Sequence, residues 1–114
     1  MKIKNINDIL IAVIEKNEMI NGIQDILDIM ATAQYNDCTG IAVYKESLGE
    51  KFFELRTGYA GEILQKFSNY NMKIAIIGDF SVYKSKSLKD FIYESNKGNR
   101  VFFKSNLEEG LNAF

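Results

Sequence analysis

The chain has 114 residues, the length of one domain around a single hydrophobic core, and we expect residues 1–114 to form one domain. Apolar residues make up 46% of it and charged residues 25%, which excludes an intrinsically disordered chain. The net charge of −1 comes from 14 basic and 15 acidic residues scattered along the sequence. No nucleic-acid partner is expected, because such a surface needs concentrated positive charge.

Histidine and cysteine, which are common catalytic residues and metal ligands, are scarce. There is no histidine, the commonest general base and transition-metal ligand. Cys38 is the only cysteine, so we expect neither an intrachain disulfide nor a structural zinc site. No apolar run approaches the roughly 20 residues that span a bilayer, and because the apolar stretch near residue 10 is short we expect no signal peptide. We therefore expect no metal, no cofactor, no membrane partner and a cytoplasmic location.

The first third of the chain changes from one apolar pattern to another. Residues 10–14 are apolar without alternation, which predicts a strand covered on both faces. A polar turn follows, and from Gly22 onward the apolar residues fall at helical spacing. Asn21 is the expected N-cap of this helix, with Gln24 in the capping-box position. Residues 41–44 predict the next strand.

The middle of the chain again contains both a helical apolar pattern and a continuous apolar run. The stretch 47–55 fits neither pattern and predicts a turn or a short helix. Thr57 precedes a clear helix, whose apolar stripe comprises Ala60, Ile63, Leu64 and Phe67. Residues 74–77 predict a third buried strand, which Gly78 ends.

The last third contains two further helices. Ser87 and Asp90 have capping-box spacing and predict the start of one helix, which Gly98 ends. Ser105 and Glu108 have the same spacing and predict the start of a short final helix.

Together these elements predict the fold class. The order is βαβαβαβα with short connections, which is typical of an α/β fold with helices packed on a largely parallel sheet. Residues 101–103 are the fourth strand, and residues 3–6 predict an additional edge strand. We therefore expect a four- or five-stranded sheet.

Two long motifs resemble a known bacterial family. They are residues 56–67, RTGYAGEILQKF, and residues 74–81, IAIIGDFS. Residues 27–33 and 86–96 add to the likeness. The chain thus resembles, over nearly its whole length, the family catalogued as domain of unknown function 4180. That family has no assigned activity, so the resemblance implies no function.

A more distant likeness, in the order and spacing of elements, is to the STAS fold of anti-sigma-factor antagonists. In that family a strand is followed by a turn of serine or threonine and glycine that opens a helix. Residues 56–61 occupy that place here, and residues 99–111 look like the family's closing strand and acidic helix. The likeness implies a STAS-like fold with a modifiable hydroxyl at Thr57. The chain departs from the family in having Leu55 and Arg56 where an aspartate usually precedes that hydroxyl.

The first candidate site is the turn at the start of the helix that follows Thr57. Its residues are Arg56, Thr57, Gly58 and Gly61. A helix N-terminus presents unpaired backbone N–H groups, which attract a phosphate, a carboxylate or an acidic group of a partner. The glycines would allow close approach. The alternative is that Thr57 only caps its own helix and the glycines pack against the sheet.

The second candidate site lies at the ends of the strands. Asp79 and Ser81 follow the third apolar strand, and Glu15 and Lys104 follow two others. Ligands of open parallel sheets gather at the carboxyl ends of strands, so these residues could line a crevice. A receiver-like phosphoacceptor site would need an acidic pair, which the chain lacks. The alternative is that Asp79 simply forms a turn.

Three weaker candidates remain. Arg56, Lys84 and Arg100 would form an anion-binding cluster if the fold joined their loops, although scattered surface charges are the commoner state. Cys38 has no second thiol nearby and is expected to be passive. Several tyrosines and phenylalanines would form an interface patch if exposed, although most such rings belong to a core.

We therefore expect a non-enzymatic binding or regulatory module, whose protein partner docks under the control of Thr57. The alternative is a small-ligand-binding or enzymatic domain that uses Asp79, Glu15 and Lys104 in a crevice. A third alternative is a homodimer with an apolar, self-complementary face.

Overall fold

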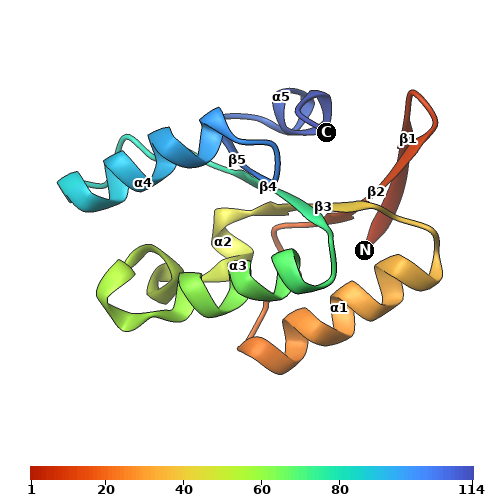
Figure 1. The fold of residues 1–114 in the computed structure, drawn as a ribbon, viewed down its shortest axis with the longest axis horizontal. Coiled ribbons are helices and arrows are strands. Elements are labelled where there is room, and N and C mark those ends of the chain that lie inside the picture. The colour runs from red at the N-terminus through yellow and green to blue at the C-terminus, as the bar shows by residue number, and fades with distance from the viewer.

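A computed structural model describes residues 1–114 and shows one five-stranded sheet (Figure 1). The strands, which lie side by side in chain order, are β1 (Lys2–Ile6), β2 (Ile9–Ile14), β3 (Gly40–Tyr44), β4 (Lys73–Ile77) and β5 (Val101–Lys104). The last four are parallel, and β1 pairs with β2 antiparallel. The predicted α/β class with a mostly parallel sheet is confirmed, and the predicted edge strand is β1.

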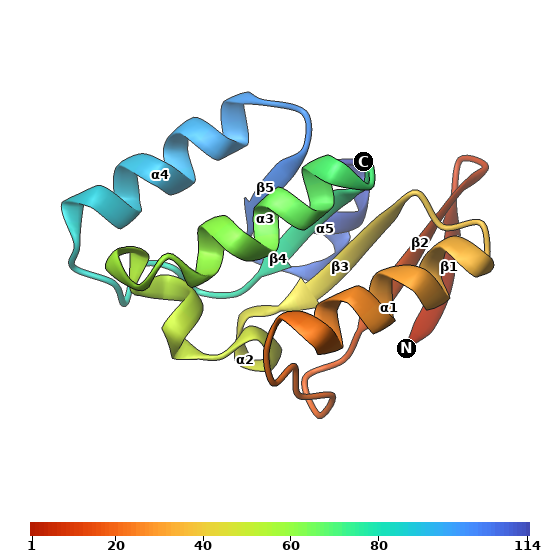
Figure 2. The same ribbon diagram turned by 60° about the horizontal axis from the view of Figure 1, so that its bottom comes forward.

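The helical elements divide unequally between the two faces of the sheet. They are α1 (Ile23–Tyr35), α2 (Lys45–Leu48), α3 (Tyr59–Asn69), α4 (Lys86–Lys97), α5 (Leu107–Asn112) and the 3₁₀ turns η1 (Glu50–Phe53) and η2 (Leu55–Thr57). α1, α3 and α4 cover one face and form the larger core with it, whereas α5 packs on the other face (Figure 2). Strands such as 74–77 are apolar throughout because both of their faces are buried.

Glycine makes close packing possible on the α5 face. A Cβ atom at Gly110 would lie 2.3 Å from Cδ1 of Ile77, and one at Gly40 would lie 2.3 Å from Cε1 of Phe114. Both distances are far shorter than any carbon–carbon contact. The short α5 helix therefore lies directly on β4, and the Phe114 ring lies on β3.

Three predicted helix starts are wrong by one or two residues. α1 is capped by Gly22, whose φ of 118° suits only glycine, and the Asn21 N–H instead donates to Asp25 Oδ2 at 2.7 Å. α4 is capped by Ser85, whose Oγ accepts from the Leu88 N–H at 3.2 Å. Asp90, expected to cap this helix, pairs with Lys86.

The start of α5 shows the same kind of shift. Asn106 is the N-cap, and its side chain accepts from the Glu109 N–H at 2.9 Å. Ser105 donates to the Glu109 carboxylate and not to Glu108. Gly98 ends α4 as predicted.

Residues 47–55, for which the sequence predicted a turn or a short helix, belong to three short helical turns that connect β3 with α3 over residues 45–57. Phe52 and Phe53 are buried and hold these turns on the core. The Phe53 ring stacks on Tyr83, with centroids 4.9 Å apart. Packing of the two rings therefore fixes a segment that has no strong local pattern.

No helix combines the length and apolar composition needed to span a bilayer.

Candidate functional site

Thr57 lies on the surface at the junction of η2 and α3. Its Oγ1 donates to the carbonyl oxygen of Glu54 at 2.8 Å, with the carbonyl of Lys51 at 3.2 Å, and accepts from the Tyr59 N–H at 3.2 Å. Gly58, and not Thr57, occupies the N-cap position. The hydroxyl thus links residues 51–57 to the first turn of α3 while remaining exposed to solvent.

The two glycines beside Thr57 have different roles. Gly58 has a left-handed φ of 76°, which a residue with a side chain adopts only at a cost. Gly61 lies in the first turn of α3 without a positive φ, and a Cβ atom there would meet nothing within 4 Å. The alternative that the glycines pack against the sheet is therefore wrong. The fold itself gives no packing reason for a glycine at position 61.

Arg56 borders an open pocket of about 760 Å³ between the turn and the start of α4. Ser85 and Ser87 line its other side, and Phe53 and Leu55 line its floor. Arg100 is not part of this region. Its guanidinium donates to the carbonyl oxygens of Phe67 and Met72, at the opposite end of α3. The predicted cluster of Arg56, Lys84 and Arg100 is therefore not formed.

Only two of the three strand-end residues lie on neighbouring strands: the Gly78 N–H, next to Asp79, donates to the Lys104 carbonyl oxygen at 3.0 Å, whereas Glu15 lies apart. Glu15 forms an ion pair with Lys2 at 2.9 Å and lines a small pocket with it, which includes neither Asp79 nor Lys104. Asp79 is exposed, and Lys104 is half-buried in β5. β3 lies between β2, which precedes Glu15, and β4, which precedes Asp79. The predicted crevice is therefore not built from these three side chains.

Asp79 forms a tight local turn with Ser81. Its Oδ1 accepts from the Ser81 hydroxyl at 2.5 Å and from the Ser81 N–H at 3.0 Å. These two hydrogen bonds lower the pKa of Asp79, and the positive charge of Lys45 adds to the effect. The turn-forming alternative for Asp79 agrees with this geometry.

The sequence did not point to Lys45, which follows β3 and contacts the loop after β4. Its Nζ donates to the Tyr83 hydroxyl at 3.2 Å and lies 4.7 Å from the centre of that ring. The hydroxyl in turn donates to Glu50 Oε1 at 3.4 Å. A Cβ atom at Gly78 would lie 2.7 Å from the Lys45 stem, so the lysine covers that glycine. The only signal in the sequence is that Lys45 directly follows a strand.

Cys38 is buried, and burial together with the nearby Asp37 raises the pKa of its thiol. The thiol therefore stays protonated at neutral pH and is a poor nucleophile.

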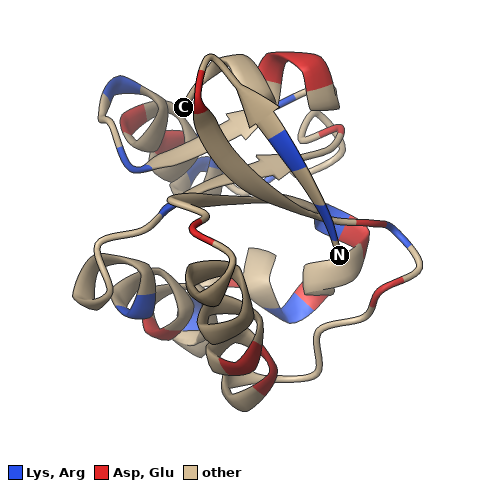
Figure 3. Cartoon of the chain, turned by 90° about the vertical axis from the view of Figure 1, so that its right-hand side faces the viewer, with Lys and Arg blue, Asp and Glu red and all other residues tan.

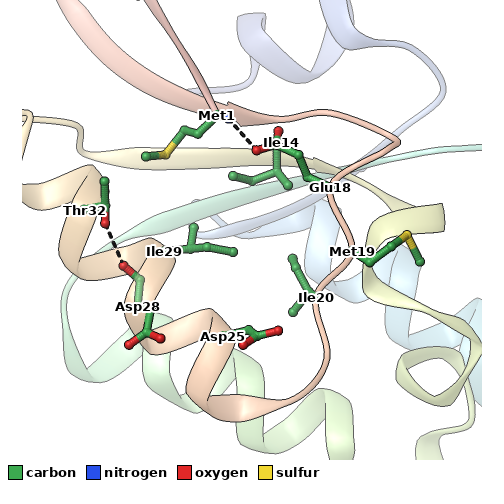
Figure 4. A pocket seen from close by; sticks show the side chains of 9 residues that line it. All are labelled: Met1, Ile14, Glu18, Met19, Ile20, Asp25, Asp28, Ile29 and Thr32. Atoms are coloured by element: carbon green, nitrogen blue, oxygen red, sulfur yellow. Dashed lines mark hydrogen bonds and ion pairs between the residues drawn. The ribbon is translucent and has the colours of Figure 1, made fainter.

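A further pocket, of about 310 Å³, lies between α1 and the segment that follows β2 (Figure 4). We call it the acidic groove; it is lined by Met1, Ile14, Glu18, Met19, Ile20, Asp25, Asp28, Ile29 and Thr32. None of these residues was a candidate site residue from the sequence. No group of three or more Cys, Asp and Glu side chains is placed to hold a metal ion in the protein.

Comparison with known proteins gives one match. The family model described as Domain of unknown function (DUF4180) matches residues 6–113. The chain belongs to this family. The DUF4180 match covers every strand from β2 to β5 and all helices, including the turn at Thr57. No curated protein and no solved structure matches the chain.

Proposed function

We propose that the chain is a non-enzymatic regulatory module that docks a protein partner at the turn formed by Arg56, Thr57, Gly58 and Gly61, the docking turn. The observation that carries the proposal is that Gly61 is a helical glycine whose side-chain position is open to solvent. A glycine in an exposed helix turn costs about 1 kcal/mol relative to alanine, and no neighbouring atom requires it there. Close approach of a second protein accounts for a glycine at this position.

We also propose that the fold is STAS-like. The helix after each parallel strand, and the closing strand β5 with the acidic helix α5, agree with the element order on which that likeness rests. One feature differs from it. The turn at Thr57 does not follow β3 directly, because α2, η1 and η2 lie between them.

Modification of Thr57 would act on two interactions. A phosphate adds about two negative charges, which the N-terminus of α3 and the neighbouring Arg56 would stabilise. A phosphorylated Thr57 also has no hydroxyl proton, so its donation to the carbonyls of Glu54 and Lys51 would be lost. The change would loosen residues 51–57 where a partner would dock.

Affinity purification from the native host tests this proposal, with the wild type and matched variants as bait. We expect Thr57→Glu and Gly61→Gln to lose or exchange a co-purified protein. Thr57→Ser keeps the hydroxyl, and Ser68→Gln adds the same side chain two turns farther along α3; both should behave as the wild type.

Mass spectrometry of the same samples reports the occupant of the docking turn and any modification of Thr57. A second copy of this chain as the differential protein would identify a homodimer. The same proteins recovered with all four variants would refute docking at this turn.

The small-ligand alternative has no comparable support. It required Asp79, Glu15 and Lys104 to converge, and β3 separates Glu15 from the other two.

A further inference from the structure

The acidic groove combines an apolar floor with a rim of carboxylates. Ile14 and Ile20 are buried at its base, whereas Met19 is 58% exposed and the Met1 side chain 18% exposed. An exposed methionine is an adaptable apolar contact, typical of surfaces that bind peptides. Figure 4 shows Met1 and Ile14 above α1 and Ile20 on the side of the neighbouring segment that faces α1, whereas Met19 turns to the other side of that segment.

The rim carries negative charge that the chain itself does not neutralise. Asp25 and Asp28 lie one turn apart on α1, and neither forms an ion pair. One oxygen of Asp25 accepts from the Asn21 N–H, and one oxygen of Asp28 accepts from Gln24 Nε2. The second oxygen of each carboxylate is free for a partner. Glu18, by contrast, is occupied by the amino group of Met1 and by the Glu15 N–H.

The charge asymmetry extends beyond the groove. Residues 17–44 contain no lysine or arginine but four acidic residues, so all 14 basic residues lie elsewhere. Figure 3 shows red segments on α1. α1 therefore carries two aspartates and no basic residue, a local negative charge that would attract cations.

The apolar floor continues along the edge strand. Ile3 of β1 pairs with Ala12 of β2, and Ala12 belongs to the core on the α1 side of the sheet. Side chains of directly opposed residues share one face, so Ile3, which is 42% exposed, lies on the same side as the groove. The result is an elongated apolar surface with acidic residues on one side, a shape that fits an extended chain better than a compact molecule.

We propose that the acidic groove binds a basic, apolar peptide segment of a protein partner. Lysine or arginine stems of the segment would cover the isoleucines and methionines, while their charged ends would pair with the free oxygens of Asp25 and Asp28. This site is separate from the docking turn and does not depend on the function proposed for it.

Titration of the isotope-labelled protein with a synthetic peptide, followed by amide NMR shifts, tests the proposal. The probe is the capped peptide Ala-Lys-Leu-Arg-Leu-Lys-Ala, and its control has glutamate at the three basic positions. We expect the basic peptide to shift amides of residues 18–32 and the acidic peptide to leave them unchanged. Because two exposed ion pairs are involved, Asp25→Asn with Asp28→Asn should weaken binding about threefold to tenfold.

These substitutions keep the oxygens that accept from Asn21 and Gln24, so the fold should be retained, which the amide spectrum verifies. The matched control, Glu94→Gln with Glu108→Gln, removes two carboxylates from other helices and gives the same net charge. It should bind as the wild type. The proposal is overturned if the basic peptide shifts no groove amides, if the acidic peptide shifts them equally, or if both double variants bind alike.

Discussion

Asp79 and Thr57 each use a short polar side chain to fix the backbone around it. Asp79 accepts two hydrogen bonds from Ser81, and Thr57 connects residues 51–57 with α3. In Asp79 the bonds go to the charged form of the group, so they favour ionisation. In Thr57 they use the proton that a modification would replace. The titration of Asp79 is therefore a direct test of the local geometry.

We expect the pKa of Asp79 to lie below its ordinary value and to rise in Ser81→Ala, which removes the hydroxyl donor. Since the folded pKa is lowered, the contribution of Asp79 to stability is present above its unfolded pKa. It is lost as the pH falls through the folded pKa. Carboxyl NMR titration of the wild type and the variant measures the pKa of Asp79 in each. Equal pKa values would show that the hydrogen bond from the Ser81 hydroxyl does not form in solution.

At the scale of elements, Gly110 of α5 and Gly61 of α3 form a natural comparison. Both are helical glycines, but a side chain at position 110 would overlap Ile77, whereas one at position 61 would meet nothing within 4 Å. The first glycine is thus explained by packing and the second is not. Their substitution by alanine should have opposite effects on the free energy of unfolding.

Gly110→Ala should lower that free energy by about 1–3 kcal/mol, because Ile77 or α5 must move to make room. Gly61→Ala should raise it by up to about 1 kcal/mol, because alanine has the higher helix propensity and nothing obstructs it. Urea unfolding of the three proteins measures both changes. A Gly61→Ala variant as destabilised as Gly110→Ala would show that the fold requires this glycine, which removes the main support for the docking turn.

The helices and strands differ in how well sequence patterns predict them. The parallel strands were predictable because strands buried on both faces are continuous apolar runs, as residues 74–77 illustrate. The helix starts were less predictable, because Ser85 and Ser87 are both acceptable caps and the sequence does not show which hydroxyl accepts from a backbone N–H. For residues 47–55 the sequence predicted a turn or a short helix, which agrees with the structure, but not the three separate turns, since these are fixed by contacts such as that of Phe53 with the distant Tyr83.

At the scale of the whole molecule, the order of the strands decides which residues can form a site. The sequence shows that polar residues follow the strands but not which strands are neighbours. β3 separates the ends of β2 and β4, and Arg100 lies at the far end of α3 from Arg56. The acidic groove was equally hidden, because its two walls come from α1 and from a loop with no pattern of its own. Thr57, in contrast, was located by its position before a helix.

Docking of a partner at the turn around Thr57 is the central claim, and photo-crosslinking in the native host tests it most directly. A photoreactive amino acid replaces Glu62, which is exposed beside the docking turn, or Glu108, which lies on α5 at the opposite face of the sheet. We predict a covalent adduct with a specific protein from position 62, absent from position 108 and lost or changed in Thr57→Glu. The same adducts from both positions, or none from position 62, would contradict the claim.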